Sequence, residues 1–481
     1  MFLHHLNMDF IYACKSSSVM DKWHVILERK CVSIMKRMSK GEILTVGLMM
    51  FSIFFGAGNL IFPPALGQAA GSNSIIAMLG FLVTGVGLPL LGITAIAMQG
   101  GKYVEFMNRK TYPWLATALL VILYLTIGPV FAVPRTGAVS FEIGIRPFLS
   151  ADSLTMGQFI YSLFFFGATY YLAMTPNKLI DRVGKLLTPA LLVFLAILFV
   201  KSFVTPLGDV LDATGAYITA PFSQGFQDGY QTMDLLASLS IGTIVVNAIR
   251  MRGVEDNKSV SKICIISGFI TVALMAMVYG SLAYIGATSA SVLGHVENGG
   301  QLLAGAVNIF FGPAGNLLVA FIIALACLTT SCGMISGMAW YFNKLTNNRI
   351  SYARLVQVST LFSFVVSNVG LTQIINLSIP FLVAIYPLVI VFVVLSLFDG
   401  VIAWRYNVYR LAIDVTLVFA VLDGLGAAGV KFAALQSLFS AYVPFYDIGM
   451  GWFVPALAAA VLGWVVDSLR GAHARDAVTA E

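Results

Sequence analysis

The chain has 481 residues, of which 59% are hydrophobic and only 10% are charged, whereas about a quarter of an ordinary soluble domain is charged. Its formal net charge is +6, but in a chain this apolar the distribution of Lys and Arg between loops is more informative than their sum. This composition excludes cytosolic enzymes, secreted modules and nucleic-acid binders, so no nucleic-acid partner is expected.

The N-terminal residues 1–38 differ from the rest of the chain because they are polar and mixed in charge. They lack the apolar core and small-residue cleavage site of a signal peptide. We therefore expect a cytoplasmic N-terminal extension. Met35 and Met38 are alternative starts, so the sequence leaves open whether the extension is translated.

After this segment, apolar runs long enough to cross a bilayer follow one another to the C-terminus. A helical span takes about 20 residues, and the continuously apolar character of the runs excludes an alternating β-barrel. We expect an all-α polytopic membrane protein with about twelve transmembrane helices. The expected spans are residues 43–69, 74–98, 114–141, 156–174, 186–204, 231–249, 262–287, 302–343, 353–368, 372–397, 411–428 and 449–467.

The distribution of Lys and Arg predicts the orientation of these spans. Cytoplasmic loops carry the excess of positive charge. If the N-terminus is inside, only four of the 28 Lys and Arg fall on the outer side, namely Arg135, Arg146, Lys201 and Lys431. Both termini are therefore expected in the cytoplasm.

The first span contains an unusual group of residues at its middle. Gly56 and Gly58 each cost about 1 kcal/mol in a helix interior, Asn59 needs hydrogen-bond partners, and Pro63 and Pro64 remove two backbone donors. Such a segment persists in a membrane only if protein or a bound ligand satisfies its freed backbone groups. The alternative is a small-residue notch for close helix packing.

The sixth span also carries Gly and hydroxyl residues at its middle, at Ser240, Gly242 and Thr243. We therefore expect broken first and sixth spans at equivalent places in two five-span halves. Paired interruptions of this kind indicate a secondary transporter built from inverted repeats, with a binding site at the membrane midplane. The expected organisation is a first repeat at 39–204, a second at 205–397, two accessory spans at 398–467 and a cytoplasmic tail at 468–481.

Consecutive hydroxyl residues, Thr329, Thr330 and Ser331, lie deep in the eighth span. They can bond back to carbonyls one turn earlier in their own helix. Alternatively, with carbonyls of the broken first span, they can complete an oxygen shell for Na⁺. The sequence leaves both interpretations open.

These residues resemble a known family. The stretch Phe54–Pro64, supported by Val133–Glu142 and Thr329–Ser331, is similar to the signature of the bacterial branched-chain amino acid:cation symporters, within the amino acid–polyamine–cation superfamily. The resemblance implies the leucine-transporter fold, with a 5+5 inverted repeat and two accessory helices. It also implies import of leucine, isoleucine and valine with Na⁺ across the bacterial inner membrane, with no cofactor.

The resemblance further implies roles for individual residues. The amides of Ala57 and Gly58 would face the substrate carboxylate, and Asn59 would be the polar group nearest the substrate or a second ion. The substrate amine and side chain would be lined by Ser240, Ile241, Gly242 and Thr243. A Na⁺ site would be formed by the carbonyls of Ser52, Phe55 and Cys327 with the hydroxyls of Thr330 and Ser331.

Charged residues near the outer end of the third span form a further candidate site. Arg135 and Glu142 are seven residues apart and so lie on one helical face. They are either an interfacial charge pair or, together with Asp234, an extracellular gate, since charges this close to a membrane interior are rare unless functional.

Proton coupling is the nearest alternative to Na⁺, with the same or other neutral amino acids as substrates. A channel is less compatible with paired mid-span breaks, because channels select ions with repeated filter sequences or rings of charge. An enzyme is not expected, because no His, Cys and carboxylate cluster has catalytic or metal-binding spacing. The oligomeric state is not predicted.

Overall fold

The computed structural model describes residues 38–174, 179–402, 406–430 and 432–469. Most of the expected N-terminal extension and C-terminal tail lies outside these residues. The helices are α3 (Lys40–Phe54), α4 (Ala57–Ala70), α5 (Ser74–Leu82), α6 (Leu88–Met98), α7 (Tyr103–Lys110), α8 (Pro113–Leu125), α9 (Ala132–Gly144), α10 (Leu154–Met174), α11 (Leu179–Val204), α12 (Pro221–Asp228), α13 (Asp234–Arg250), α14 (Asn257–Leu293), α15 (Gly299–Leu345), α16 (Tyr352–Ser367), α17 (Leu371–Ile402), α18 (Tyr406–Ala427), α19 (Ala433–Tyr442) and α20 (Phe453–Leu469). Short 3₁₀ or π turns are η1 (Gly71–Asn73), η2 (Val83–Gly87), η3 (Thr126–Val130), η4 (Arg146–Phe148), η5 (Ala151–Ser153), η6 (Gly215–Tyr217), η7 (Gly229–Thr232) and η8 (Tyr446–Ile448).

The expectation of an all-α chain is confirmed, because every regular element of the described residues is helical. Each of the twelve apolar segments predicted from the sequence falls on a helix or on consecutive helices. By length and apolar composition alone, five helical stretches in the described residues could cross a membrane, or six if the bent pair Pro221–Thr232 and Asp234–Arg250 forms one span. Pro189–Val204, Tyr352–Ser367 and Phe453–Leu469 are shorter apolar helices.

The first span is broken where the sequence predicts. Helix α3 ends at Phe54 and α4 begins at Ala57, and both Phe55 and Gly56 have extended backbones. The packing alternative also applies about three turns further along. A Cβ on Gly67 would lie 2.0 Å from the carbonyl oxygen of Ala283, so α4 meets α14 backbone to backbone.

The predicted position of the sixth-span break is wrong. The break lies at Met233, which has a left-handed backbone (φ 61), and the two halves of the span are bent by 46°. Gly242 is inside continuous α13, and a Cβ there would lie 2.4 Å from Cδ1 of Ile96. Small residues therefore let α13 approach α6. The first half of the span, α12 and η7, contains the polar residues Gln227, Asp228 and Gln231. They lower the mean hydropathy of this segment, so a scan for apolar runs does not find it.

Two further irregularities shape the helices around the centre. The π turn η3, with Gly128 non-helical and Pro129 within it, precedes α9 in the third span. All residues of α9 are buried. The long α15 is kinked at Gly312 (φ 67), followed by Pro313, so it is not one straight crossing.

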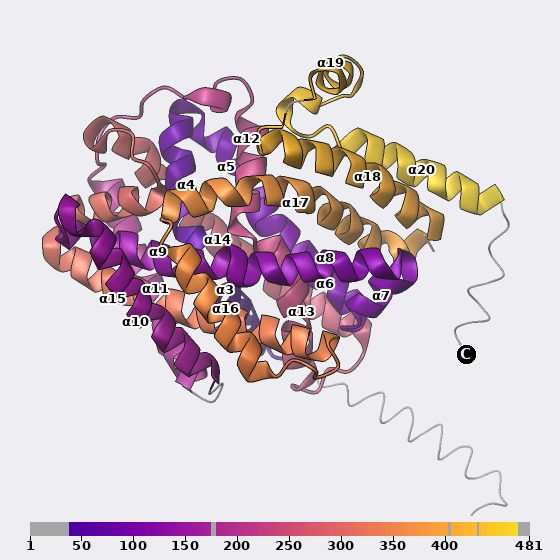
Figure 1. Ribbon diagram of the computed structural model, residues 1–481, viewed down its shortest axis with the longest axis horizontal. Helices are drawn as coiled ribbons and strands as arrows, with labels where there is room; N and C mark the ends of the chain where they lie inside the picture. Colours follow the sequence, from indigo (N-terminus) through magenta and orange to yellow (C-terminus); the bar gives the residue numbers. More distant parts are fainter. Residues whose placement is uncertain (1–37, 175–178, 403–405, 431, 470–481) are drawn as a thin grey trace, which may run out of the picture.

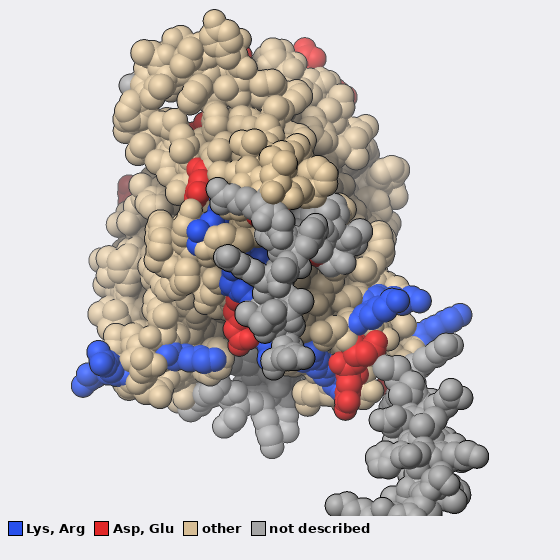
Figure 2. All heavy atoms as spheres, turned by 90° about the vertical axis from the view of Figure 1, so that its right-hand side faces the viewer, with Lys and Arg blue, Asp and Glu red and all other residues tan. Residues whose placement is uncertain are grey.

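The helices form a bundle in which α14 packs along both α3 and α4, α9 and α15 contact α4, and α13 contacts α3. Helices α18 and α20 lie beside one another along one side (Figure 1). A Cβ on Gly463 would lie 2.6 Å from the carbonyl of Asn407, which shows how closely α20 packs on α18. On the face drawn in Figure 2, Lys and Arg lie along the lower edge and, beside Asp and Glu, further up the middle, while most of the remaining described surface is uncharged.

Candidate functional site

The two helix breaks meet at one buried side chain. Asn59, in the first turn of α4, donates from Nδ2 to the carbonyl of Phe54 at 2.9 Å and to Oδ2 of Asp234 at 2.9 Å. Only 1% of Asn59 is exposed. It therefore satisfies a carbonyl freed by the first break and connects that break to the second.

Asp234 is buried at the second break, where only 4% of it is exposed. It is the first residue of α13, a position where the helix dipole favours a carboxylate. Its Oδ2 accepts a hydrogen bond from the Tyr279 hydroxyl at 3.4 Å, and its backbone amide donates to Oγ1 of Thr232 at 3.3 Å. A carboxylate is thus held in the interior by neutral partners.

Arg135 lies beside the same breaks, although the sequence suggested the outer end of the third span. Its Nη1 donates to the carbonyl of Gln231 at 2.6 Å, and its Nη2 donates to Oγ of Ser378 at 3.4 Å. The guanidinium is 5.0 Å from the centroid of the Phe62 ring. A Cβ on Gly58 would lie 3.4 Å from Nη1. Arg135 therefore connects α9 to α4, η7 and α17.

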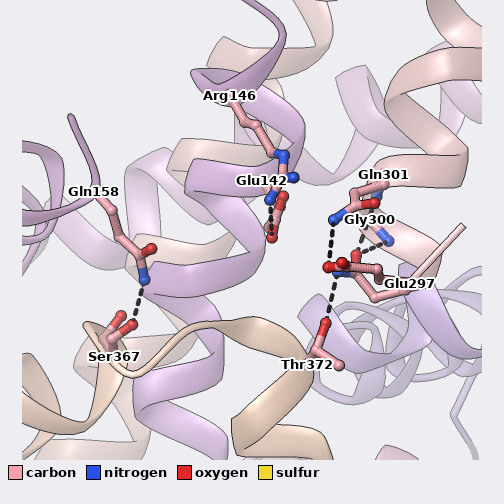
Figure 3. Close-up of polar contacts among 9 residues, drawn as sticks. Glu142, Arg146, Gln158, Glu297, Gly300, Gln301, Ser367 and Thr372 are labelled. Atoms are coloured by element: carbon pink, nitrogen blue, oxygen red, sulfur yellow. Dashed lines mark hydrogen bonds and ion pairs between the residues drawn. The ribbon is translucent and has the colours of Figure 1, made fainter. Parts of the chain in front are cut away.

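Glu142 occupies a separate site and does not pair with Arg135. Its Oε1 accepts a hydrogen bond from Nη1 of Arg146 at 3.1 Å (Figure 3). The start of α15 is close by, since a Cβ on Gly300 would lie 3.3 Å from Cβ of Glu142. Asn298, which caps α15, also donates to Thr372 at 3.1 Å. This cluster joins α9, α15 and α17, away from the two breaks.

The predicted Na⁺ ligands are only partly brought together. Cγ2 of Thr330 would be 3.7 Å from a Cβ on Gly56, so α15 does reach the first break. The Thr330 hydroxyl, however, donates back to the carbonyl of Ala326 at 2.9 Å, as the alternative interpretation predicts. Ser331 Oγ is 3.3 Å from Oγ1 of Thr169 on α10.

The predicted amine and side-chain pocket is not at the breaks. Ser240, Ile241, Gly242 and Thr243 lie in the continuous part of α13, and a helix rises about 1.5 Å per residue. The Ser240 hydroxyl donates within its own helix, to the carbonyl of Ala237 at 2.8 Å. Gly242 faces Ile96 of α6, and none of the four residues has a hydrogen bond to Asn59 or Asp234 among the described residues.

Several polar residues at the breaks were not found from the sequence. Thr232, Tyr279 and Ser378 contact Asp234 or Arg135, and the ring of Tyr386 stacks on Tyr230 at 4.3 Å. In the sequence, each of them is recognisable only as a polar residue inside an apolar span. Such residues are common in membrane helices, so the contacts become evident only from the tertiary structure.

The arrangement is suited to binding and not to covalent chemistry. It places one buried cation, one buried carboxylate and the ends of two broken helices in one region. Among the residues that the structure describes, no group of three or more His, Cys, Asp and Glu is placed to hold a metal ion.

Comparisons with known proteins agree on one family. A family model described as "Branched-chain amino acid transport protein" matches residues 39–470. The chain is 45% identical over 425 residues to the branched-chain amino acid permease BraB of Bacillus subtilis (strain 168), which covers 88% of this chain and 95% of that protein. It is 38% identical over 433 residues to the branched-chain amino acid permease BrnQ of Escherichia coli (strain K12), covering 89% and 96%.

A third relative is the branched-chain amino acid transport system 2 carrier protein of Pseudomonas aeruginosa, 42% identical over 433 residues and covering 89% of this chain and 97% of that protein. Among solved structures, Mhp1, a nucleobase-cation-symport-1 family transporter in a closed conformation, is similar with a TM-score of 0.56. It is 14% identical and covers 89% of this chain and 93% of that chain. At this identity the likeness shows the fold alone, which is the leucine-transporter fold.

Proposed function

Because the chain belongs to the branched-chain amino acid transport protein family, we propose that it imports leucine, isoleucine and valine by Na⁺ symport with alternating access. The membrane is the bacterial cytoplasmic membrane and both termini are cytoplasmic. The Lys and Arg along the lower edge of the face drawn in Figure 2 support this orientation. The family and the fold neighbour are transporters, so the chain is not an enzyme.

The observation that carries the proposal is the hydrogen bond from Asn59 to Asp234, which joins the two helix breaks in the interior. Breaks at the midplane are where transporters of this architecture hold substrate and ions. The amides of Ala57 and Gly58 open α4, and a helix N-terminus favours an anion. We assign the substrate carboxylate to them and place Asn59 nearest the substrate.

We assign Na⁺ to a site between the first break and α15. Its ligands are the carbonyls of Ser52, Phe55 and Cys327 and the hydroxyls of Thr330 and Ser331. The approach of Thr330 to Gly56 supports this assignment. Ion binding would require both hydroxyls to exchange the hydrogen bonds that they now make with Ala326 and Thr169.

Gating is assigned to Arg135, Glu142 and Asp234. Arg135 connects the third span to the outer half of the sixth, and Asp234 connects the two breaks. Glu142, with Arg146, lies where α9 meets the start of α15. Residues 39–204 and 205–397 form the two repeats, and 398–467 provide the accessory spans.

The experiment is uptake of labelled leucine into proteoliposomes under an imposed Na⁺ gradient, then under a pH gradient without Na⁺. A tenfold Na⁺ gradient is worth about 1.4 kcal/mol and 100 mV about 2.3 kcal/mol, so one Na⁺ suffices for roughly 500-fold accumulation of a zwitterion. Accumulation with Na⁺ alone supports the proposal. Accumulation with the pH gradient alone would mean that the coupling ion is H⁺ and not Na⁺. No accumulation under either gradient would contradict the substrate class.

A further inference from the structure

Two opposite charges are buried beside the breaks without pairing with each other. Arg135 is 2% exposed and Asp234 is 4% exposed. In the described part of the chain the ion pairs that form are elsewhere, Lys110 with Asp399 and Arg146 with Glu142. Isolated charges in a low-dielectric interior are costly unless a partner compensates them. Both groups are therefore prepared for a charged ligand.

The hydrogen-bond partners of each charge are neutral. Arg135 donates to one carbonyl and one hydroxyl, both neutral, and its Nε has no hydrogen-bond partner although it is buried. The Oδ2 atom of Asp234 accepts hydrogen bonds from the neutral side chains of Asn59 and Tyr279. The nearby Tyr386 hydroxyl is also buried without a partner.

Adjacent residues of α4 contact the two charges. Gly58 faces the guanidinium of Arg135, and Asn59, the next residue, bonds to the carboxylate of Asp234. The charges are also connected through the sixth span, because Arg135 holds the carbonyl of Gln231, three residues before Asp234. Two opposite charges beside the same two breaks suit a ligand that itself carries an anion and a cation.

We propose that Arg135 binds the carboxylate and Asp234 binds the ammonium group of one α-amino acid, so that the transporter recognises the zwitterion as a unit. The Asn59 amide and the Tyr279 hydroxyl orient the Asp234 carboxylate toward the ammonium group. The amides at the start of α4 share the carboxylate with Arg135. This inference rests on the proposed function and extends it, because it names the side chains that neutralise each end of the substrate.

The test removes one charge from the protein and the matching charge from the ligand. Binding is measured as ligand-dependent thermal stabilisation of the purified full chain, since a ligand that binds the native state raises its melting temperature. The ligands are leucine, 4-methylpentanoate, which lacks the ammonium group, and 3-methylbutylamine, which lacks the carboxylate. For the unaltered protein we expect leucine to bind at least 100-fold more tightly than either analogue.

In Asp234→Asn we expect leucine binding to weaken about 100-fold while 4-methylpentanoate binding changes less than threefold. In Arg135→Gln we expect leucine binding to weaken about 100-fold while 3-methylbutylamine binding changes less than threefold. The matched controls are Asp152→Asn and Arg349→Gln, which are exposed and should keep all three affinities. If either isosteric variant does not melt cooperatively, Asp234→Glu and Arg135→Lys replace them. Each keeps the charge but changes where the side chain places it, so leucine binding should weaken about tenfold while the analogue that lacks the matching charge binds as before. Unchanged leucine binding in both of these variants overturns the inference.

If Asp234→Asn and Arg135→Gln both still bind leucine more tightly than either analogue, the inference is overturned. A variant in which leucine binding is unchanged but its Na⁺ dependence is lost also overturns it, because Asp234 would then be an ion ligand. The proposed function fails separately, when the unaltered protein accumulates no leucine under either ion gradient. A positional isomer sharpens the result, since 3-amino-4-methylpentanoate places the charges one carbon further apart and should bind at least tenfold more weakly than leucine.

Discussion

The first and sixth spans are broken in different ways. At the first break, Gly56 and Gly58 weaken the helix, and the Asn59 side chain bonds to the freed carbonyl of Phe54. At the second, a methionine adopts the left-handed backbone, and the surrounding contacts with Arg135 and Asn59 hold the segment. One break is encoded locally by its residues, whereas the other depends on neighbouring helices.

The largest effect is expected from filling the first break. A Cβ on Gly58 would already lie 3.2 Å from the Phe62 ring and 3.4 Å from Nη1 of Arg135, so Gly58→Leu should abolish leucine uptake while leaving membrane insertion intact. Uptake into proteoliposomes and the amount of protein inserted are measured together. Gly280→Leu is the control, since a Cβ at Gly280 has nothing within 4 Å. Normal transport by Gly58→Leu would mean that the first break serves packing alone.

The second break is tested by changing side-chain branching at Met233. The left-handed conformation costs an L-residue about 1–2 kcal/mol, and it is a severe outlier for a β-branched residue. Met233→Ile should therefore lower the melting temperature and raise the KM for leucine about tenfold. Met233→Leu keeps an unbranched Cβ and should lie close to the unaltered protein. Equal behaviour of the two variants would show that the backbone at 233 is unimportant.

A smaller effect is expected at the proposed ion site. Ser331→Ala removes one of the assigned hydroxyl ligands, so the Na⁺ concentration for half-maximal uptake should rise several-fold at saturating leucine. Ser281→Ala removes another buried hydroxyl that bonds within its own helix and serves as the control. Unchanged Na⁺ dependence in Ser331→Ala would remove Ser331 from the site.

The smallest effect is expected at the position where the sequence placed the second break. The Ser240 hydroxyl bonds to the carbonyl of Ala237 in its own helix, so Ser240→Ala should change the KM for leucine less than twofold. The measurement is initial uptake rate against leucine concentration. A tenfold rise in the KM for leucine would place Ser240 in the substrate site and contradict the position of the second break.

The sequence by itself determined the helical class, the approximate position of each apolar helix and the first break. These features depend on local properties, namely hydrophobic runs of membrane length and the backbone behaviour of glycine and proline. The motif beginning at Phe54 was also sufficient to indicate the family, which the comparisons confirm.

Only the tertiary structure decided where the second break lies and which charges face the interior. Nothing in the residue type of Met233 signals a left-handed backbone, and Gly242, which suggests a break, instead allows close packing on Ile96. The heptad spacing placed Arg135 and Glu142 on one face, yet they lie at different depths of α9 and have different partners. Such choices depend on contacts between residues far apart in the chain, which no local pattern contains.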